Sequence, residues 1–225
     1  ILEAQCCFNK ENFTAARVLY KSILKEYPHD RAAQQGLHAA NKAIKLTFTE
    51  EKFKSLILDY SQCEYDRVLR EGGVFVELYP QNVDLLNLVG SAYLMLGHND
   101  DAIQHFKQVI QVKPQSSESY NNFAVALQKK GEHSEAIRQC QQAIKFNPSY
   151  AEAYYNMSNS LNALNDYPAA IDNYKKAISL KEDYVEAYNN LGTIYIRQKK
   201  FEEAIKTLLT CLSIDSKYIQ AITNL

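Results

Sequence analysis

A 34-residue period runs through most of this 225-residue sequence. Several positions keep the period without a gap, among them a column of alanines: Ala102, Ala136, Ala170 and Ala204. Tyrosines and prolines repeat at the same spacing: Tyr120, Tyr154 and Tyr188, and Pro80, Pro114 and Pro148. A period of about 20–50 residues is typical of stacked repeats, in which each unit buries its apolar face against its neighbours. The sequence therefore predicts one continuous array instead of one or two globular domains.

Each unit contains two stretches with helical spacing. In residues 151–184 the first stripe is Tyr154, Met157, Ser158 and Leu161, and the second is Ala170, Tyr174 and Ala177. Between the stripes, Asp166 can cap a helix and Pro168 falls in its first turn. The predicted fold class is therefore all-α, built of stacked antiparallel helix pairs.

These columns resemble the tetratricopeptide repeat family. That family places bulky, small, aromatic, alanine and proline residues at fixed positions, which in 83–116 are Leu86, Val89, Gly90, Tyr93, Ala102, Phe106, Val109 and Pro114. The resemblance implies a right-handed α-solenoid, with complete repeats at 83–116, 117–150, 151–184 and 185–218. Cys140 and Cys211 fall at packing positions of this pattern, so we expect both to be buried.

The remaining segments follow the pattern less closely. We expect a degenerate, N-terminally cut repeat at 1–30, an extra unpaired helix and linker at 31–48, a divergent repeat at 50–82, and the start of a truncated repeat at 219–225. Thr49 is predicted to cap a helix, with Phe48 packed onto Phe53. Gly72 and Gly73 each cost about 1 kcal/mol against alanine inside a helix, so we expect a weakened or kinked helix there. The cut ends predict a piece of a longer polypeptide.

Composition excludes several functional classes. The formal net charge is −1, with 25 basic and 26 acidic side chains, which argues against nucleic-acid binding. No apolar run approaches the roughly 18–20 residues that span a membrane, so no membrane partner is predicted. The five cysteines are odd in number and form no C-x-x-C pair. This pattern argues against a zinc site or a disulfide framework and favours a reducing, cytoplasmic location.

Nothing in the sequence resembles an active site. No phosphate-binding glycine motif, nucleophile elbow or H-E-x-x-H pattern is present, and the five histidines are scattered. We therefore predict no catalytic residues, no metal site and no cofactor, and expect that these residues are not an enzyme.

The most informative polar pattern is an asparagine column at position 6 of each repeat: Asn122, Asn156, Asn190 and Asn224. First helices are expected to line the inner groove of the array, where an amide can pair with a peptide backbone through its donors and acceptor. The predicted peptide-binding residues are Asn87, Asn121, Asn122, Tyr155, Asn156, Asn159, Asn189, Asn190, Arg197 and Asn224. Replacing Asn122, Asn156 and Asn190 together by alanine is expected to weaken peptide capture and leave folding intact.

This groove is similar to the superhelical arm of the O-linked N-acetylglucosamine transferase family, whose asparagine ladder holds peptide. It departs from tetratricopeptide repeats that clamp an acidic chaperone tail, because position 5 holds Asn87, Asn121, Tyr155 and Asn189 where the clamp has lysine. Position 2 is acidic, with Asp84, Glu118, Glu152 and Glu186. These carboxylates either are solvated side chains in the first turns of helices, where the helix dipole favours negative charge, or form a site for a basic ligand.

The sequence thus predicts a scaffold that binds a partner protein or an extended peptide. The alternative is the substrate-recruiting arm of a larger enzyme, a glycosyltransferase or a sulfotransferase-like protein, whose catalytic domain is absent from this chain. The sequence makes no prediction about oligomeric state.

Overall fold

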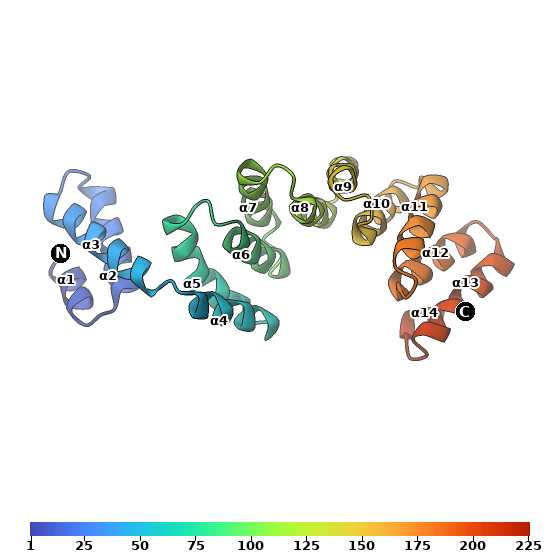
Figure 1. Cartoon of the computed structure of the whole chain (residues 1–225), viewed down its shortest axis with the longest axis horizontal. Coiled ribbons are helices and arrows are strands. Elements are labelled where there is room, and N and C mark those ends of the chain that lie inside the picture. Colours follow the sequence, from blue (N-terminus) through green and yellow to red (C-terminus); the bar gives the residue numbers. More distant parts are fainter. The chain divides into compact units, whose positions relative to one another are not determined.

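The structure is a computed structural model that describes all 225 residues. They form fourteen α-helices and no β-strand, which confirms the predicted all-α class. The chain divides into two compact units, unit 1 (residues 1–96) and unit 2 (residues 97–225), coloured blue to green and green to red in Figure 1. This division falls inside the repeat predicted at 83–116, between its first and second helices.

Unit 1 contains six helices: α1 (Leu2–Asn9), α2 (Phe13–Glu26), α3 (Arg31–Thr47), α4 (Glu50–Ser61), α5 (Tyr65–Leu78) and α6 (Val83–Met95). The extra helix expected at 31–48 corresponds to α3. It is not isolated, because it packs along α2, and the ring of Tyr20 lies directly against Gly36. A Cβ added at Gly36 would come within 2.2 Å of that ring, so only glycine permits this approach. The expectation of an unpaired helix is corrected in this respect.

The start of α4 shows how local sequence sets a helix boundary. The Thr49 hydroxyl accepts a hydrogen bond from the Lys52 N–H at 3.2 Å, which satisfies one of the unpaired donors of the first turn. The rings of Phe48 and Phe53 meet edge to face with centroids 6.4 Å apart. The predicted cap and its hydrophobic staple are therefore both confirmed.

Helix α5 is continuous, whereas a weakened or kinked helix was expected. It is one unbroken helix from Tyr65 to Leu78, although Gly72 and Gly73 lie within it. A Cβ added at Gly72 would come within 2.9 Å of a Val89 methyl group, whereas one at Gly73 would meet nothing within 4 Å. Gly72 therefore permits α5 and α6 to pack closely, and this tertiary contact offsets its low helix propensity.

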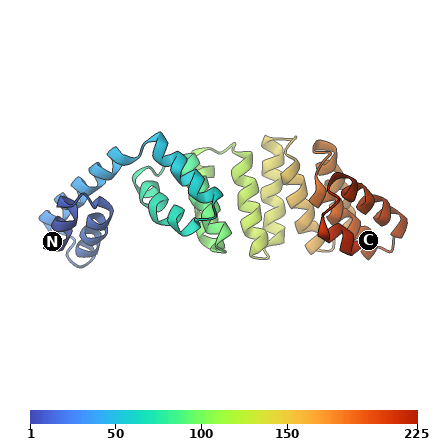
Figure 2. The ribbon, with the colours of Figure 1, turned by 90° about the horizontal axis from the view of Figure 1, so that it is seen from below.

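Unit 2 contains eight helices: α7 (Asn99–Val112), α8 (Ser117–Lys129), α9 (His133–Phe146), α10 (Ala151–Ala163), α11 (Tyr167–Leu180), α12 (Val185–Arg197), α13 (Phe201–Ile214) and α14 (Ile219–Asn224). Helices α8 and α9, α10 and α11, and α12 and α13 pack as pairs, and α9 contacts α10 as α11 contacts α12. Figure 2 shows the helices from green to orange next to one another in chain order. The stacked helix pairs predicted from the repeat are present.

Small side chains hold the pairs together in unit 2. The four alanines of the 34-residue column are at most 2% exposed. Gly192 on α12 faces α13, where an added Cβ would come within 2.8 Å of the Leu208 side chain. Cys140 and Cys211 are completely buried free thiols, as expected.

The turns between paired helices share a backbone conformation that the repeat pattern did not predict. Gly97, Gly131, Asn165 and Lys199 are spaced by 34 residues and all have positive φ, at 80°, 80°, 61° and 59°. Cys63 continues the column into unit 1 with φ 63°. Glycine adopts this left-handed conformation freely and asparagine tolerates it, while lysine and cysteine are strained there. The turn geometry is therefore set by the packing of the helix pair. None of the fourteen helices is long and apolar enough to cross a membrane.

Candidate functional site

The predicted peptide-binding residues of unit 2 lie on its first helices, α8, α10, α12 and α14. These helices present positions 5 and 6 of each repeat side by side: Asn121 and Asn122, Tyr155 and Asn156, Asn189 and Asn190, and Asn224. Asn121 and Asn189 are only 5% and 7% exposed, and the other five are half-buried. We call this surface the asparagine face. Asn87 lies on α6 in unit 1 and is half-buried there.

The position-6 amides of three repeats bond to the preceding first helix. Asn156 Nδ2 donates to Asn121 Oδ1 at 2.9 Å, Asn190 Nδ2 donates to the Tyr155 hydroxyl at 3.2 Å, and Asn224 Nδ2 donates to Asn189 Oδ1 at 2.9 Å. Each bond joins residues 35 positions apart, so position 6 of one repeat always reaches position 5 of the repeat before it. We call these three contacts rungs.

The rungs give the asparagine column a structural role that the repeat pattern did not predict. The available signal was the polar side chain at position 5 of every repeat, which offers an acceptor one residue before the asparagine column. Because Asn156 and Asn190 hold neighbouring helices together, their replacement by alanine cannot leave the packing untouched. We therefore expect the triple alanine variant to unfold at a lower temperature than wild type.

The rungs carry more hydrogen bonds toward the C-terminal end of unit 2. Asn190 Nδ2 also donates to Asn159 Oδ1 at 3.1 Å, and the same oxygen accepts from the Tyr174 hydroxyl at 2.5 Å. Asn189 Nδ2 donates in turn to Asn190 Oδ1 at 3.3 Å. The amides around Asn190 are therefore largely engaged within the protein.

The opposite end of the face is open. Asn122 is the one residue of the position-6 column whose side chain makes no hydrogen bond. Asn156 uses its nitrogen in a rung, while its Oδ1 accepts no hydrogen bond. Two adjacent repeats thus present a complete amide and an amide oxygen that is held in a fixed orientation. These are the groups that a peptide backbone can pair with.

Tyrosines form a second row beside the asparagines. The Tyr155 ring lies 4.9 Å from that of Tyr184 and 5.9 Å from that of Tyr174, measured between centroids. Burial raises the pKa of Tyr150 to about 12, and the nearby carboxylates of Glu118 and Glu152 add to the effect. Burial likewise raises the pKa of Tyr184. These phenols stay protonated at neutral pH and remain hydrogen-bond donors.

The acidic row of position 2 accompanies the tyrosines. Glu118, Glu152 and Glu186 make no ion pair, and Glu118 and Glu186 are exposed. Arg197 is exposed at the end of α12, where its charge acts against the increase in the pKa of Tyr174 that burial causes. No three His, Cys, Asp or Glu side chains are grouped to hold a metal ion. The face is therefore an amide and phenol surface with an acidic edge.

Comparison with known proteins gives matches to repeat families. A model described as TPR repeat matches residues 90–131, 127–161 and 158–199, and one described as tetratricopeptide repeat matches 185–218. No curated protein sequence matches the chain.

Many solved structures are similar to the chain. A crystal structure of MamA is 28% identical, with a TM-score of 0.64, over 72% of this chain and 95% of that one. The thermophilic TPR protein TTC0263 of Thermus thermophilus is 20% identical, with a TM-score of 0.62, over 76% and 93%. The first TPR of Spaghetti (RPAP3), bound to the HSP90 peptide SRMEEVD, is 25% identical, with a TM-score of 0.51, over 53% and 94%.

Proposed function

Because the chain belongs to the tetratricopeptide repeat family, we propose that it is a protein-interaction module that holds an extended peptide or protein segment along the asparagine face. The observation that carries this proposal is the open amide of Asn122 beside the open Oδ1 of Asn156, whose orientation the first rung fixes. A polar group held in place before binding loses little conformational freedom when the ligand arrives. The peptide-bound RPAP3 repeat supports the same kind of ligand.

The proposed ligand is not an acidic chaperone tail. The peptide bound to the RPAP3 repeat contains two glutamates and an aspartate. The face of the present chain carries Glu118, Glu152 and Glu186 without ion partners, and its position 5 has no lysine. Such a row repels carboxylates across the face. The near-zero net charge also supports a protein ligand over a nucleic acid.

We further propose that these residues bind without catalysing a reaction, and that the chain acts in the cytoplasm. All five cysteines are free thiols, and Cys6 and Cys63 are exposed, which suits a reducing compartment. The recruiting arm of a larger enzyme would use the same face, so the peptide-binding test applies equally to that alternative.

The test starts from a peptide selected by display of random ten-residue sequences on the full chain. Its affinity is then measured by fluorescence anisotropy for wild type, Asn122→Ala and Asn173→Ala. Asn173 lies on α11, away from the face, and bonds to the Ala169 carbonyl within its own helix. Asn122→Ala is expected to weaken binding about five- to tenfold, which corresponds to the free energy that one or two hydrogen bonds contribute to binding. Asn173→Ala is expected to leave the affinity unchanged. Equal affinities for all three proteins, or failure to select any peptide, would refute the proposal.

A further inference from the structure

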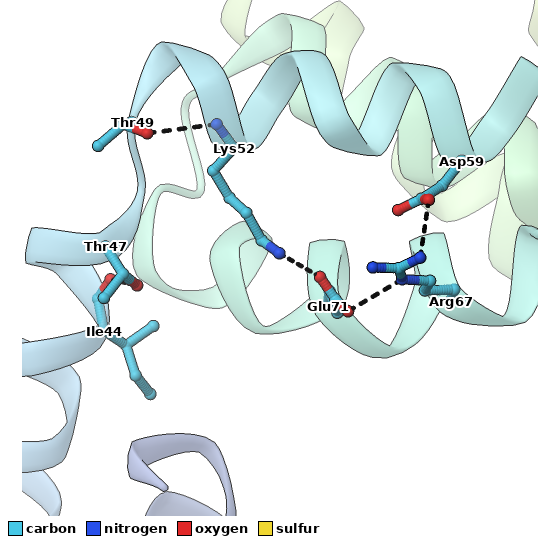
Figure 3. Close-up of polar contacts among 7 residues, drawn as sticks. All are labelled: Ile44, Thr47, Thr49, Lys52, Asp59, Arg67 and Glu71. Atoms are coloured by element: carbon cyan, nitrogen blue, oxygen red, sulfur yellow. Dashed lines mark hydrogen bonds and ion pairs between the residues drawn. The ribbon is translucent and has the colours of Figure 1, made fainter. Parts of the chain in front are cut away.

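Unit 1 contains a cleft that is separate from the asparagine face. It has a volume of about 440 Å³ and is lined by Thr14, Ile44, Thr47, Lys52, Arg70, Glu71, Val74 and Phe75. These residues come from the start of α2, the end of α3, the start of α4 and the middle of α5. Figure 3 shows part of this region, with Ile44 and Thr47 on α3 across from Lys52 on α4 and Glu71 on α5.

The cleft has an apolar floor and a polar rim. Ile44 and Phe75 belong to the hydrophobic core of this part of unit 1, with Val74 packed beside them. The Thr47 hydroxyl donates to the Ile44 carbonyl at 2.7 Å, and its oxygen can still accept a hydrogen bond. A cavity with apolar walls and a few convergent polar groups is the usual form of a small-molecule site, and its volume lies in the usual range of about 300–1,000 Å³.

Two groups of ion pairs hold the helices around the cleft. On one side Glu71 of α5 pairs with Lys52 of α4 and, at 3.3 Å, with Arg67, which reaches Asp59 at 3.1 Å (Figure 3). On the other side Glu77 of α5 pairs with Arg17 of α2. The helices that form the walls are thus cross-linked through side chains.

The charges of the lining do not cancel. Burial opposes ionisation of Glu71, but hydrogen bonds and charge from Lys52 and Arg67 prevail and lower its pKa, so the carboxylate is ionised at neutral pH. The network of Lys52, Glu71, Arg67 and Asp59 is therefore neutral as a whole. Arg70 lines the same cleft, is exposed, and makes no ion pair. Its guanidinium is the one uncompensated charge of the cleft.

We propose that this cleft binds a small amphipathic carboxylic acid, with its apolar body on Ile44, Val74 and Phe75 and its carboxylate on Arg70. A planar guanidinium pairs with a carboxylate through two parallel hydrogen bonds, which a neutral ligand cannot reproduce. The proposal uses other residues than the asparagine face and does not depend on peptide binding there.

The experiment measures binding of 4-phenylbutyrate and of its neutral analogue 4-phenylbutan-1-ol to the full chain by calorimetry. Wild type is expected to bind the acid about tenfold more tightly than the alcohol. Arg70→Met keeps a long side chain with an aliphatic stem but removes the guanidinium charge, and it is expected to abolish this preference. Arg31→Met is the matched control, because Arg31 is exposed at the start of α3, outside the cleft lining, and is expected to retain the preference.

Filling the cleft provides an independent check. Thr14 is an exposed residue of α2 that lines the cleft, so Thr14→Trp is expected to abolish binding of both ligands with an unchanged circular dichroism spectrum. Equal binding of acid and alcohol, no binding of either, or a preference that survives in Arg70→Met would overturn the proposal. So would binding of acetyl-Gly-Gly-Phe without binding of phenylbutyrate, since that result assigns the cleft to a peptide terminus.

Discussion

Replacing Asn156 by alanine removes the rung between α10 and α8 without disturbing the apolar core. Its Nδ2 donates at 2.9 Å to Asn121 Oδ1, and Asn121 is only 5% exposed, so little water can replace the lost donor. Leaving a buried acceptor unpaired costs about 1–3 kcal/mol. Alanine also favours a helix over asparagine by about 0.5 kcal/mol, which partly offsets that cost.

Asn122→Ala is the matched control for this prediction. It makes the same chemical change at the same position of the adjacent repeat, where the side chain has no hydrogen-bond partner in the protein. The gain in helix propensity is therefore common to both variants. The difference between their stabilities isolates the rung, and its expected size is about 1–3 kcal/mol.

Thermal unfolding followed by circular dichroism measures this difference. For a chain of this size each kcal/mol shifts the midpoint by about 2–4 °C, so Asn156→Ala should unfold about 2–12 °C below Asn122→Ala. Hydrogen exchange should place the loss in α8 and α10, because repeat arrays are stabilised mainly by contacts between neighbours. Equal midpoints for the two variants would show that the rung contributes nothing and would refute the reasoning.

Two further predictions concern unit 1. Gly36→Ala should lower the free energy of unfolding, measured by chemical denaturation, by about 1–3 kcal/mol, because the added Cβ would clash with the Tyr20 ring. Gly73→Ala should raise it by about 1 kcal/mol, since an added Cβ there has no atom within 4 Å and alanine favours the helix. A Gly36→Ala variant as stable as Gly73→Ala would contradict this packing. The lowered pKa of Glu71 contributes stability that is present above its ordinary value of 4.5 and is lost as the pH falls through the folded-state pKa. Glu71→Gln should therefore flatten the pH dependence of the unfolding midpoint below about pH 4.5, and an unchanged acid profile would count against the ion pairs with Lys52 and Arg67.

Local signals in the sequence predicted the helices and their caps well. Thr49 and Asp166 stand directly before helices, and the side-chain oxygen of each accepts a hydrogen bond from the backbone N–H three residues later. Such a cap depends only on neighbouring residues, so the sequence was sufficient to predict it. The buried alanine column followed from the 34-residue period alone. These features depend on residues close in sequence or on exact repetition.

Features that depend on the mutual position of distant helices were not predictable in this way. The rungs require position 6 to meet position 5 of the preceding repeat, which fixes a register that the period does not specify. The left-handed turn at Lys199 has no glycine or asparagine to signal it. The cleft of unit 1 arises because α3 packs on α2 and lies beside α5, whereas the sequence indicated a helix without a partner.

The rungs also determine how unit 2 would respond to force. Each rung joins one first helix only to the next, so a load along the row from α8 to α14 passes through all three in series. The rung at Asn190 is reinforced by Asn159, and the rung at Asn156 is reinforced by Gln128 of α8, which donates to the Asn156 carbonyl and, at 2.7 Å, to the Ser160 hydroxyl. Extension would therefore load the joints between α10 and α12 and between α12 and α14 before the joint between α8 and α10, which has three side-chain hydrogen bonds. A ligand that bridges Asn122 and Asn156 would therefore stiffen a joint that is already well connected and leave the extension of the C-terminal joints unchanged.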